Sequence, residues 1–216
     1  TLGVHRTVLQ GLANGDTAEV FQAFNPLMSP ELGRDALDQR ASITADWALP
    51  SVGFNIYLEW GRNDYSPRWS YIVRAPEHSQ AFTYGLRQIL YQSSNRIWLL
   101  SGEISQFIHS RDYDIDLGKS QNGFYTHGTV TQGYTHRGQI LGARIGPGAD
   151  SQSLNLDYFY RRGSAGIFLE RVSRNKDYLY GDPNSGPGDI RRMNVQMRYG
   201  VTTDFWILPD LLLTGE

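Results

Sequence analysis

The sequence contains no cysteine and no long apolar run. Without cysteine among its 216 residues, the chain has no disulfide framework and no thiolate chemistry. This fits an exported protein that crosses an oxidising compartment without mispairing. A run of about 18 apolar residues is also missing, which excludes a membrane-spanning helix. The chain opens on Thr1 with neither a basic start nor an apolar segment, so no signal peptide is visible, and we expect a mature form or a fragment.

The chain also lacks an excess of charge of either sign. Its 20 basic and 22 acidic residues give a formal net charge of -2, without a basic stripe. Nucleic acid is therefore not an expected partner. No Gly-x-Ser-x-Gly segment and no common zinc-ligand spacing occur. We accordingly expect no enzymatic activity, no metal and no cofactor.

Aromatic residues and glycine are abundant, with 13 Tyr, 9 Phe, 5 Trp and 23 Gly. This mixture favours strands, turns and surfaces that carry rings. Apolar and polar residues alternate strictly in segments 51–60, 151–162 and 191–201, which indicates strands with one apolar face. Less regular segments of the same kind lie near residues 3–12, 39–49, 81–92, 95–107, 125–134, 164–174 and 203–213. Their length of roughly ten residues is that of a tilted strand across a bilayer.

Both a membrane barrel and a soluble β sandwich contain strands of this period, and the polar face distinguishes them. In this chain the polar positions carry charges of both signs in mid-strand, which would be solvated in a sandwich and would line the lumen of a barrel. These candidate lumen residues are Asp46, Glu59, Arg87, Glu103, Asp157, Arg161 and Arg198.

Two features favour the barrel. Rings lie at strand ends, as interfacial aromatic residues do, at Trp47, Trp60, Trp98, Tyr178, Tyr180 and Trp206. Long polar segments at 61–80, 109–123 and 174–190 alternate with tight connections at 50–51 and 161–164. The predicted fold class is therefore all-β: an antiparallel transmembrane β-barrel of the outer-membrane type, formed by residues 1–216 as one domain of about ten strands. A soluble sandwich is the alternative.

Four stretches carry a family resemblance. They are IYLEWGRND (56–64), APEHSQAFTYGL (75–86), FYTHGTVTQGYTHRGQILGARIGPGADSQSL (124–154) and GIFLERVSRNKDYLY (166–180). Together they resemble the capsule assembly Wzi family of outer-membrane proteins over roughly residues 38–180. The resemblance implies a barrel in the bacterial outer membrane that holds capsular or related polysaccharide at the cell surface, as a lectin and not an enzyme. It also implies that this chain is part of a larger barrel, with N-terminal and C-terminal parts missing.

Within the third stretch, Tyr-Thr-His occurs twice. A metal site is disfavoured because His127 and His136 are nine residues apart and no third ligand accompanies them. The structural interpretation is a strand over residues 125–132 that ends in a turn or bulge at Gly133. The functional interpretation places the repeated residues against a glycan, with rings on the C–H face of a sugar and polar groups on its hydroxyls or carboxylates. The candidate glycan residues are Tyr125, His127, Tyr134, His136, Arg137 and, in the first long loop, Trp69.

The predicted function is thus the binding of surface or capsular polysaccharide by a barrel whose other partner is outer-membrane lipid. Two alternatives remain open. One is a porin-like passive channel with a lumen of mixed charge. The other is a scaffold subunit of a larger envelope complex.

Overall fold

A computed structural model gives the fold and describes residues 1–10, 37–63, 73, 80–108, 124–126, 132–174, 176, 194–208 and 211–215. The regular structure in this part of the chain is strand, apart from one turn of 3₁₀ helix, η1 (Pro50–Val52). The strands are β1 (Leu2–Gln10), β2 (Leu37–Leu49), β3 (Phe54–Asn63), β4 (Gln80–Ser93), β5 (Arg96–Gln106), β6 (Thr135–His136), β7 (Gln139–Ile140), β8 (Asp150–Tyr160), β9 (Gly163–Arg174), β10 (Asn194–Leu208) and β11 (Leu211–Gly215). In these described ranges, no helix is long and apolar enough to span a membrane.

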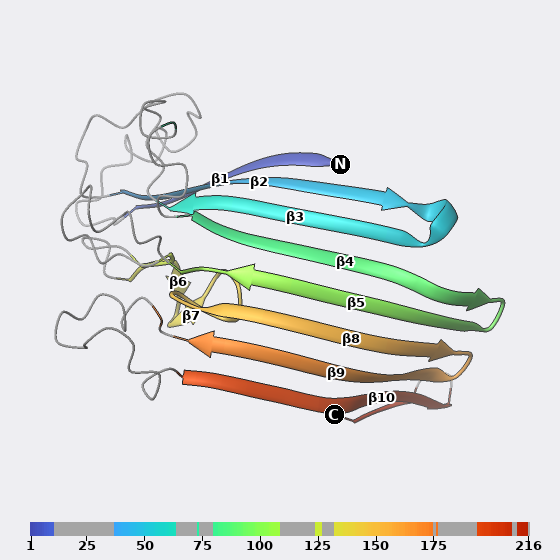
Figure 1. Cartoon of the computed structure of the whole chain (residues 1–216). Helices are drawn as coiled ribbons and strands as arrows, with labels where there is room; N and C mark the ends of the chain where they lie inside the picture. The colour runs from blue at the N-terminus through green and yellow to red at the C-terminus, as the bar shows by residue number, and fades with distance from the viewer. Residues whose placement is uncertain are drawn as a thin grey trace.

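Nine strands form one antiparallel sheet in the order β1-β2-β3-β4-β5-β8-β9-β10-β11. Figure 1 shows the strands side by side in this order. β6 and β7 form a separate two-stranded hairpin. The predicted all-β antiparallel architecture is confirmed. The sheet is not closed into a barrel, because β1 and β11 lie at opposite edges and, in the described residues, do not pair with each other.

Short connections lie at one end of the sheet and long ones at the other (Figure 1). At the first end, η1 and Gly53 join β2 to β3, and two residues join β4 to β5 and β8 to β9. At the second end, the connections are residues 11–36, 64–79, 107–149 and 175–193. The predicted alternation of long and short connections is confirmed.

The register separates polar from apolar residues. Cross-strand partners lie on the same face of a sheet, so a row of partners can be followed from strand to strand. One row consists of Asp46, Tyr57, Gly85, Glu103, Ser153, Glu170 and Arg198. The row one residue away consists of Trp47, Ile56, Leu86, Gly102, Leu154, Leu169 and Tyr199. Because successive side chains point to opposite faces, the first row belongs to a polar face and the second to an apolar face.

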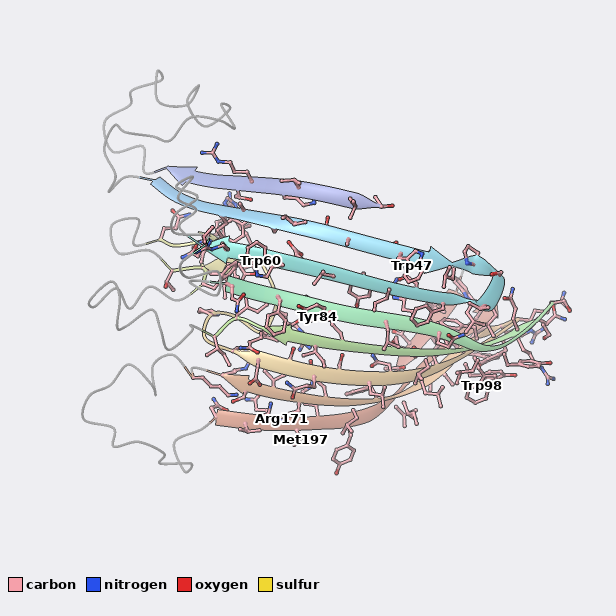
Figure 2. The ribbon with its side chains drawn as sticks, turned by 45° about the horizontal axis from the view of Figure 1, so that its top comes forward. Trp47, Trp60, Tyr84, Trp98, Arg171 and Met197 are labelled. Carbon is pink, nitrogen blue, oxygen red and sulfur yellow. The ribbon has the colours of Figure 1, made fainter. Side chains whose placement is uncertain are left out.

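The apolar face is largely exposed. Its exposed side chains come from all the long strands and include Leu2, Val4, Ile43, Trp47, Ile56, Leu86, Trp98, Ile104, Leu154, Ile167, Leu169, Val195, Met197, Tyr199 and Val201. Trp47, Trp60 and Trp98 all lie on it. In Figure 2, Trp47 and Trp98 are nearer the short-turn end and Trp60 is nearer the long connections. Of the three other rings predicted at strand ends, Trp206 lies near the end of β10, and Tyr178 and Tyr180 are outside the described residues.

Two strand predictions are wrong. The described residues of the range 125–134, which are 125–126 and 132–134, form no strand: Tyr125 lies in a turn with a φ of 78°, and the next described strand begins at Thr135. The segment has the composition of a strand, but the Tyr125 ring packs into the buried hydrophobic cluster that includes Phe107 and Phe124. The bounds predicted for the last two segments, 191–201 and 203–213, are also wrong, because β10 runs without interruption from Asn194 to Leu208 and a new strand starts at Leu211.

Glycine at position 85 gives a first prediction. The Tyr57 ring lies over Gly85, where a Cβ atom would be 1.9 Å from Tyr57 Cζ. The Tyr57 hydroxyl donates to Glu103 Oε2 at 2.6 Å, so Gly85→Ala displaces the ring and breaks this bond. We expect the free energy of unfolding, measured with urea in detergent, to fall by about 1–3 kcal/mol.

Gly102→Ala is the matched control for this experiment. Gly102 is also in mid-strand, but a Cβ there meets its nearest atom, Ser153 O, at an ordinary 3.5 Å. Its effect should stay within about 0.5 kcal/mol. Equal effects of the two substitutions would contradict the role of the Tyr57 ring.

Candidate functional site

A cavity of about 390 Å³ lies on the polar face at the end with the long connections. This volume is within the range of roughly 300–1,000 Å³ that small-ligand sites occupy. One wall is the sheet itself, through polar-face residues of β1 to β4. The other wall comes from the connection between β5 and β8, including Phe107, residues 124–125 and residues 141–143. Segments that are far apart in the sequence therefore form the site together.

Four rings form what we call the aromatic wall: Phe107, Phe124, Tyr125 and Tyr134. Tyr125 is central. Phe107 and Tyr134 stack on it with ring centroids 5.3 and 5.6 Å away, and Phe124 meets it edge-on at 4.9 Å. These spacings are favourable for aromatic pairs. The wall belongs to a buried cluster with Ala81, Ile145, Ala149 and Val172.

Hydrogen bonds and glycine hold Tyr125 in place. Its hydroxyl accepts from the Ala143 N–H at 3.0 Å, and its carbonyl accepts from the Tyr134 N–H at 2.9 Å. A Cβ at Gly142 would lie 2.3 Å from the Tyr125 ring, and one at Gly133 would lie 2.6 Å from the Tyr125 carbonyl oxygen. Both positions therefore require glycine, and Gly133 also has a left-handed φ of 58°.

Arg40 supports the aromatic wall from β2. Its guanidinium carbon is 4.4 Å from the Tyr134 ring centroid and 5.6 Å from that of Tyr125. These distances allow cation–π attraction to both rings. Only 6% of Arg40 is exposed, so its charge acts mainly inside the protein. We assign Arg40 to the positioning of the wall.

The exposed side chains of the cavity lining include Glu59 and His5. His5 Nε2 is 3.3 Å from Thr44 Oγ1, a contact in which either group can donate. No hydrogen bond or ion pair joins Glu59 to the described residues. The remaining polar lining includes the hydroxyls of Thr7, Ser42 and Thr83. The cavity thus combines ring faces, one exposed carboxylate, an imidazole and hydroxyls.

Ion pairs lie beside the cavity, at the same end of the sheet. Glu170 accepts from Arg144 and also pairs with Arg198 at 3.2 Å. Asp150 pairs with Arg171 at 2.7 Å and with Lys176. The Arg144–Glu170 pair attaches the end of the β5–β8 connection to β9. The other pairs join β8, β9, β10 and Lys176 to one another.

The structure separates the predicted glycan residues. Tyr125 and Tyr134 belong to the aromatic wall, but Tyr125 is only 8% exposed and is assigned to packing. His136 and Arg137 are exposed in the β6–β7 hairpin and do not line the cavity. Arg137 has a φ of 49° and the next residue, Gly138, one of 79°, as in two-residue hairpin turns that require positive φ. The predicted residues His127 and Trp69 lie outside the described residues.

The predicted lumen residues also fall into two groups. Six of them share the polar face: Asp46, Glu59, Arg87, Glu103, Asp157 and Arg198. The seventh, Arg161, is not in mid-strand but in the turn between β8 and β9. Sequence reasoning missed His5, Arg40, Phe107 and Phe124. No local signal marks them, because they meet only when the β5–β8 connection folds over the sheet.

In the described residues, no group of three or more His, Asp or Glu side chains could hold a metal ion. Comparisons with known proteins add no assignment. No family model, no curated protein and no solved structure matches the chain. The resemblance to the capsule assembly family therefore depends on the sequence motifs alone.

Tyr125 gives a prediction about pH. Burial, the largest cause, raises the pKa of the Tyr125 phenol, and the bond from the Ala143 N–H partly opposes this. Because the folded pKa exceeds the unfolded one, folded protein binds more protons in the alkaline range. The stabilisation is complete below about pH 10 and is lost as pH rises through the folded pKa.

The measurement is the free energy of unfolding of wild type and Tyr125→Phe from about pH 8 to 12. Wild type should be more stable by about 1–2 kcal/mol at pH 8, because phenylalanine leaves the Ala143 N–H without its acceptor. This advantage should shrink above about pH 10. The contributions of the other tyrosines to the free energy of unfolding are the same in both proteins and cancel in the difference. Parallel curves would contradict the buried position of Tyr125.

Proposed function

We propose that the protein forms part of a β-barrel wall in the bacterial outer membrane and binds capsular or related surface polysaccharide there, without catalysis. The observation that supports this most strongly is the separation of two adjacent rows of residues, one polar and one apolar, across the strands from β2 to β10. A barrel in lipid needs one apolar outer face and one polar inner face.

The exposure of the apolar face supports contact with lipid. Soluble monomers rarely expose contiguous apolar patches of more than a few hundred Å². Here exposed apolar side chains extend from Val4 on β1 to Tyr199 on β10, and no second layer covers them in the described residues. In a membrane, acyl chains would cover this face. The edges would have to be paired as well, by further strands or by each other, because unpaired backbone groups are costly in lipid.

The arrangement of connections supports an orientation. Outer-membrane barrels have short turns on the periplasmic side and longer loops outside. By this rule, the end with η1 faces the periplasm and the end with the cavity faces the cell exterior. The cavity would then be on the side where surface polysaccharide lies.

The cavity and the sequence motifs together favour a glycan over a freely diffusing solute. An aromatic ring can pack on the C–H face of a sugar, and hydroxyl and carboxylate groups can form hydrogen bonds with the hydroxyls of that sugar. The β5–β8 connection also packs on the polar face through the aromatic wall. Such a packed segment would narrow a lumen, which disfavours an open channel. Low conductance in a planar bilayer would agree with this view, and a large steady conductance would favour the channel.

Membrane contact can be tested with a pair of neighbouring residues. Leu154 is 51% exposed on the apolar face, and Ser153 lies on the polar face between Glu103 and Glu170. Leu154→Arg should impair insertion into phosphatidylcholine vesicles, because arginine at mid-membrane costs about 2–4 kcal/mol. Ser153→Arg should insert normally, because acidic partners flank it. If Leu154→Arg inserts as well as wild type, this face is not in lipid.

Polysaccharide binding needs its own experiment. Calorimetry should show saturable binding of the detergent-solubilised protein to polysaccharide that has been purified from the surface of the cells that produce the protein. An unrelated outer-membrane barrel in the same detergent is the control. Binding no stronger than that of the control would remove the lectin proposal, whatever the result in vesicles.

A further inference from the structure

We propose that the cavity is a subsite for a sugar residue that donates hydrogen bonds, through hydroxyl or amino groups, and that it selects against uronic acids. Glu59 is the acceptor and Tyr134 is the ring platform. This inference rests on the proposed function and names the class of saccharide. It differs from the expectation, from sequence alone, that Arg137 and the histidines donate to the hydroxyls or carboxylates of a polysaccharide.

The selectivity follows from which charged group of the cavity a ligand can reach. Of the two strongly charged side chains in the cavity lining, the cation is buried and the anion is exposed. Arg40 is 6% exposed and held against the rings, whereas Glu59 is exposed on β3. A ligand that enters the cavity therefore meets the carboxylate. A carboxylate accepts hydrogen bonds only, so the ligand must donate them.

The position of Tyr134 supplies the apolar contact. Its ring is half-buried and lines the cavity. Tyr125 stacks on it at 5.6 Å with an interplanar angle of 13°. Arg40 lies within 5.6 Å of the Tyr125 ring as well. A pyranose ring in the cavity would pack its C–H face against the part of Tyr134 that lines it.

The neighbouring polar groups fit a sugar and not a free anion. Thr7, Ser42 and Thr83 add hydroxyls that can either donate or accept. The Gly61 backbone lies near the ring of Phe124, where even a Cβ would be 3.5 Å from Phe124 Cζ. The absence of a side chain at Gly61 keeps the space between Glu59 and the aromatic wall open.

A sugar acid would place a second negative charge beside Glu59. Like charges at close range are unfavourable, and burial in a partly enclosed cavity strengthens the repulsion. A hydroxyl or a protonated amine would instead form a charge-assisted hydrogen bond. The selectivity thus depends on one carboxylate and can be inverted by removing its charge.

The test compares three hexasaccharides in calorimetry with the detergent-solubilised protein: chitosan hexamer, maltohexaose and polymannuronate hexamer. Wild type should bind the first two more tightly than the third. Glu59→Gln should weaken binding of the chitosan hexamer about tenfold and strengthen binding of polymannuronate. Opposite signs for two probes are not produced by a loss of folded protein.

Two controls separate the subsite from general effects. Asp157→Asn removes one negative charge from the same face outside the cavity lining and should leave the order of affinities unchanged. Tyr134→Phe keeps the platform and should bind like wild type, whereas Tyr134→Leu should weaken all three probes.

Three results would overturn the inference. They are tightest binding of polymannuronate by wild type, equal changes for all three probes in Glu59→Gln, and no binding of any probe. The proposed function is judged separately, by binding of the native surface polysaccharide. If that polysaccharide binds and Glu59→Gln leaves the order of the hexasaccharides unchanged, the lectin proposal stands and the subsite falls.

Discussion

Backbone hydrogen bonding between antiparallel neighbours is the constraint on which the rest of this molecule depends. Each pairing fixes which residues share a face, and a shift by one residue would exchange the two faces. The register places Glu103 beside Ser153 and Gly102 beside Leu154. Repeated across the sheet, it gathers charge on one side and apolar surface on the other. The cavity, the aromatic wall and the proposed lipid contact all follow from this separation.

Large rings and small residues share the polar face in a complementary way. Tyr57 covers Gly85, and Phe168 covers Gly200, where a Cβ would lie 2.8 Å from the ring. Aromatic side chains that shield strand glycines restore contacts that glycine alone cannot make. The same principle recurs at Gly142 under Tyr125. At these three positions, glycine leaves the space that a ring occupies against the backbone.

The sequence predicts the strands well because period-two alternation is a local property. Segments such as 51–60 and 151–162 show it, and most of their residues lie in β3 (Phe54–Asn63) and β8 (Asp150–Tyr160), with the expected faces. The charged residues of the polar face, from Asp46 to Arg198, follow from the same pattern. The cavity does not, because His5, Arg40 and Tyr134 come from distant segments. Tyr125 shows why: its neighbours have strand-like composition, but burial of its ring against Phe107 decides the local conformation.

The connection between β5 and β8 has a consequence for the order of folding. Four of the eight pairings in the sheet are hairpins whose connections are two to four residues long. The contact between Arg40 and Tyr134 closes a much longer loop. It can offset the entropy cost of closing that loop only after β2 to β5 have paired. The aromatic wall should therefore dock onto a sheet that already exists. The cavity would be the last part of the molecule to form and the first to open.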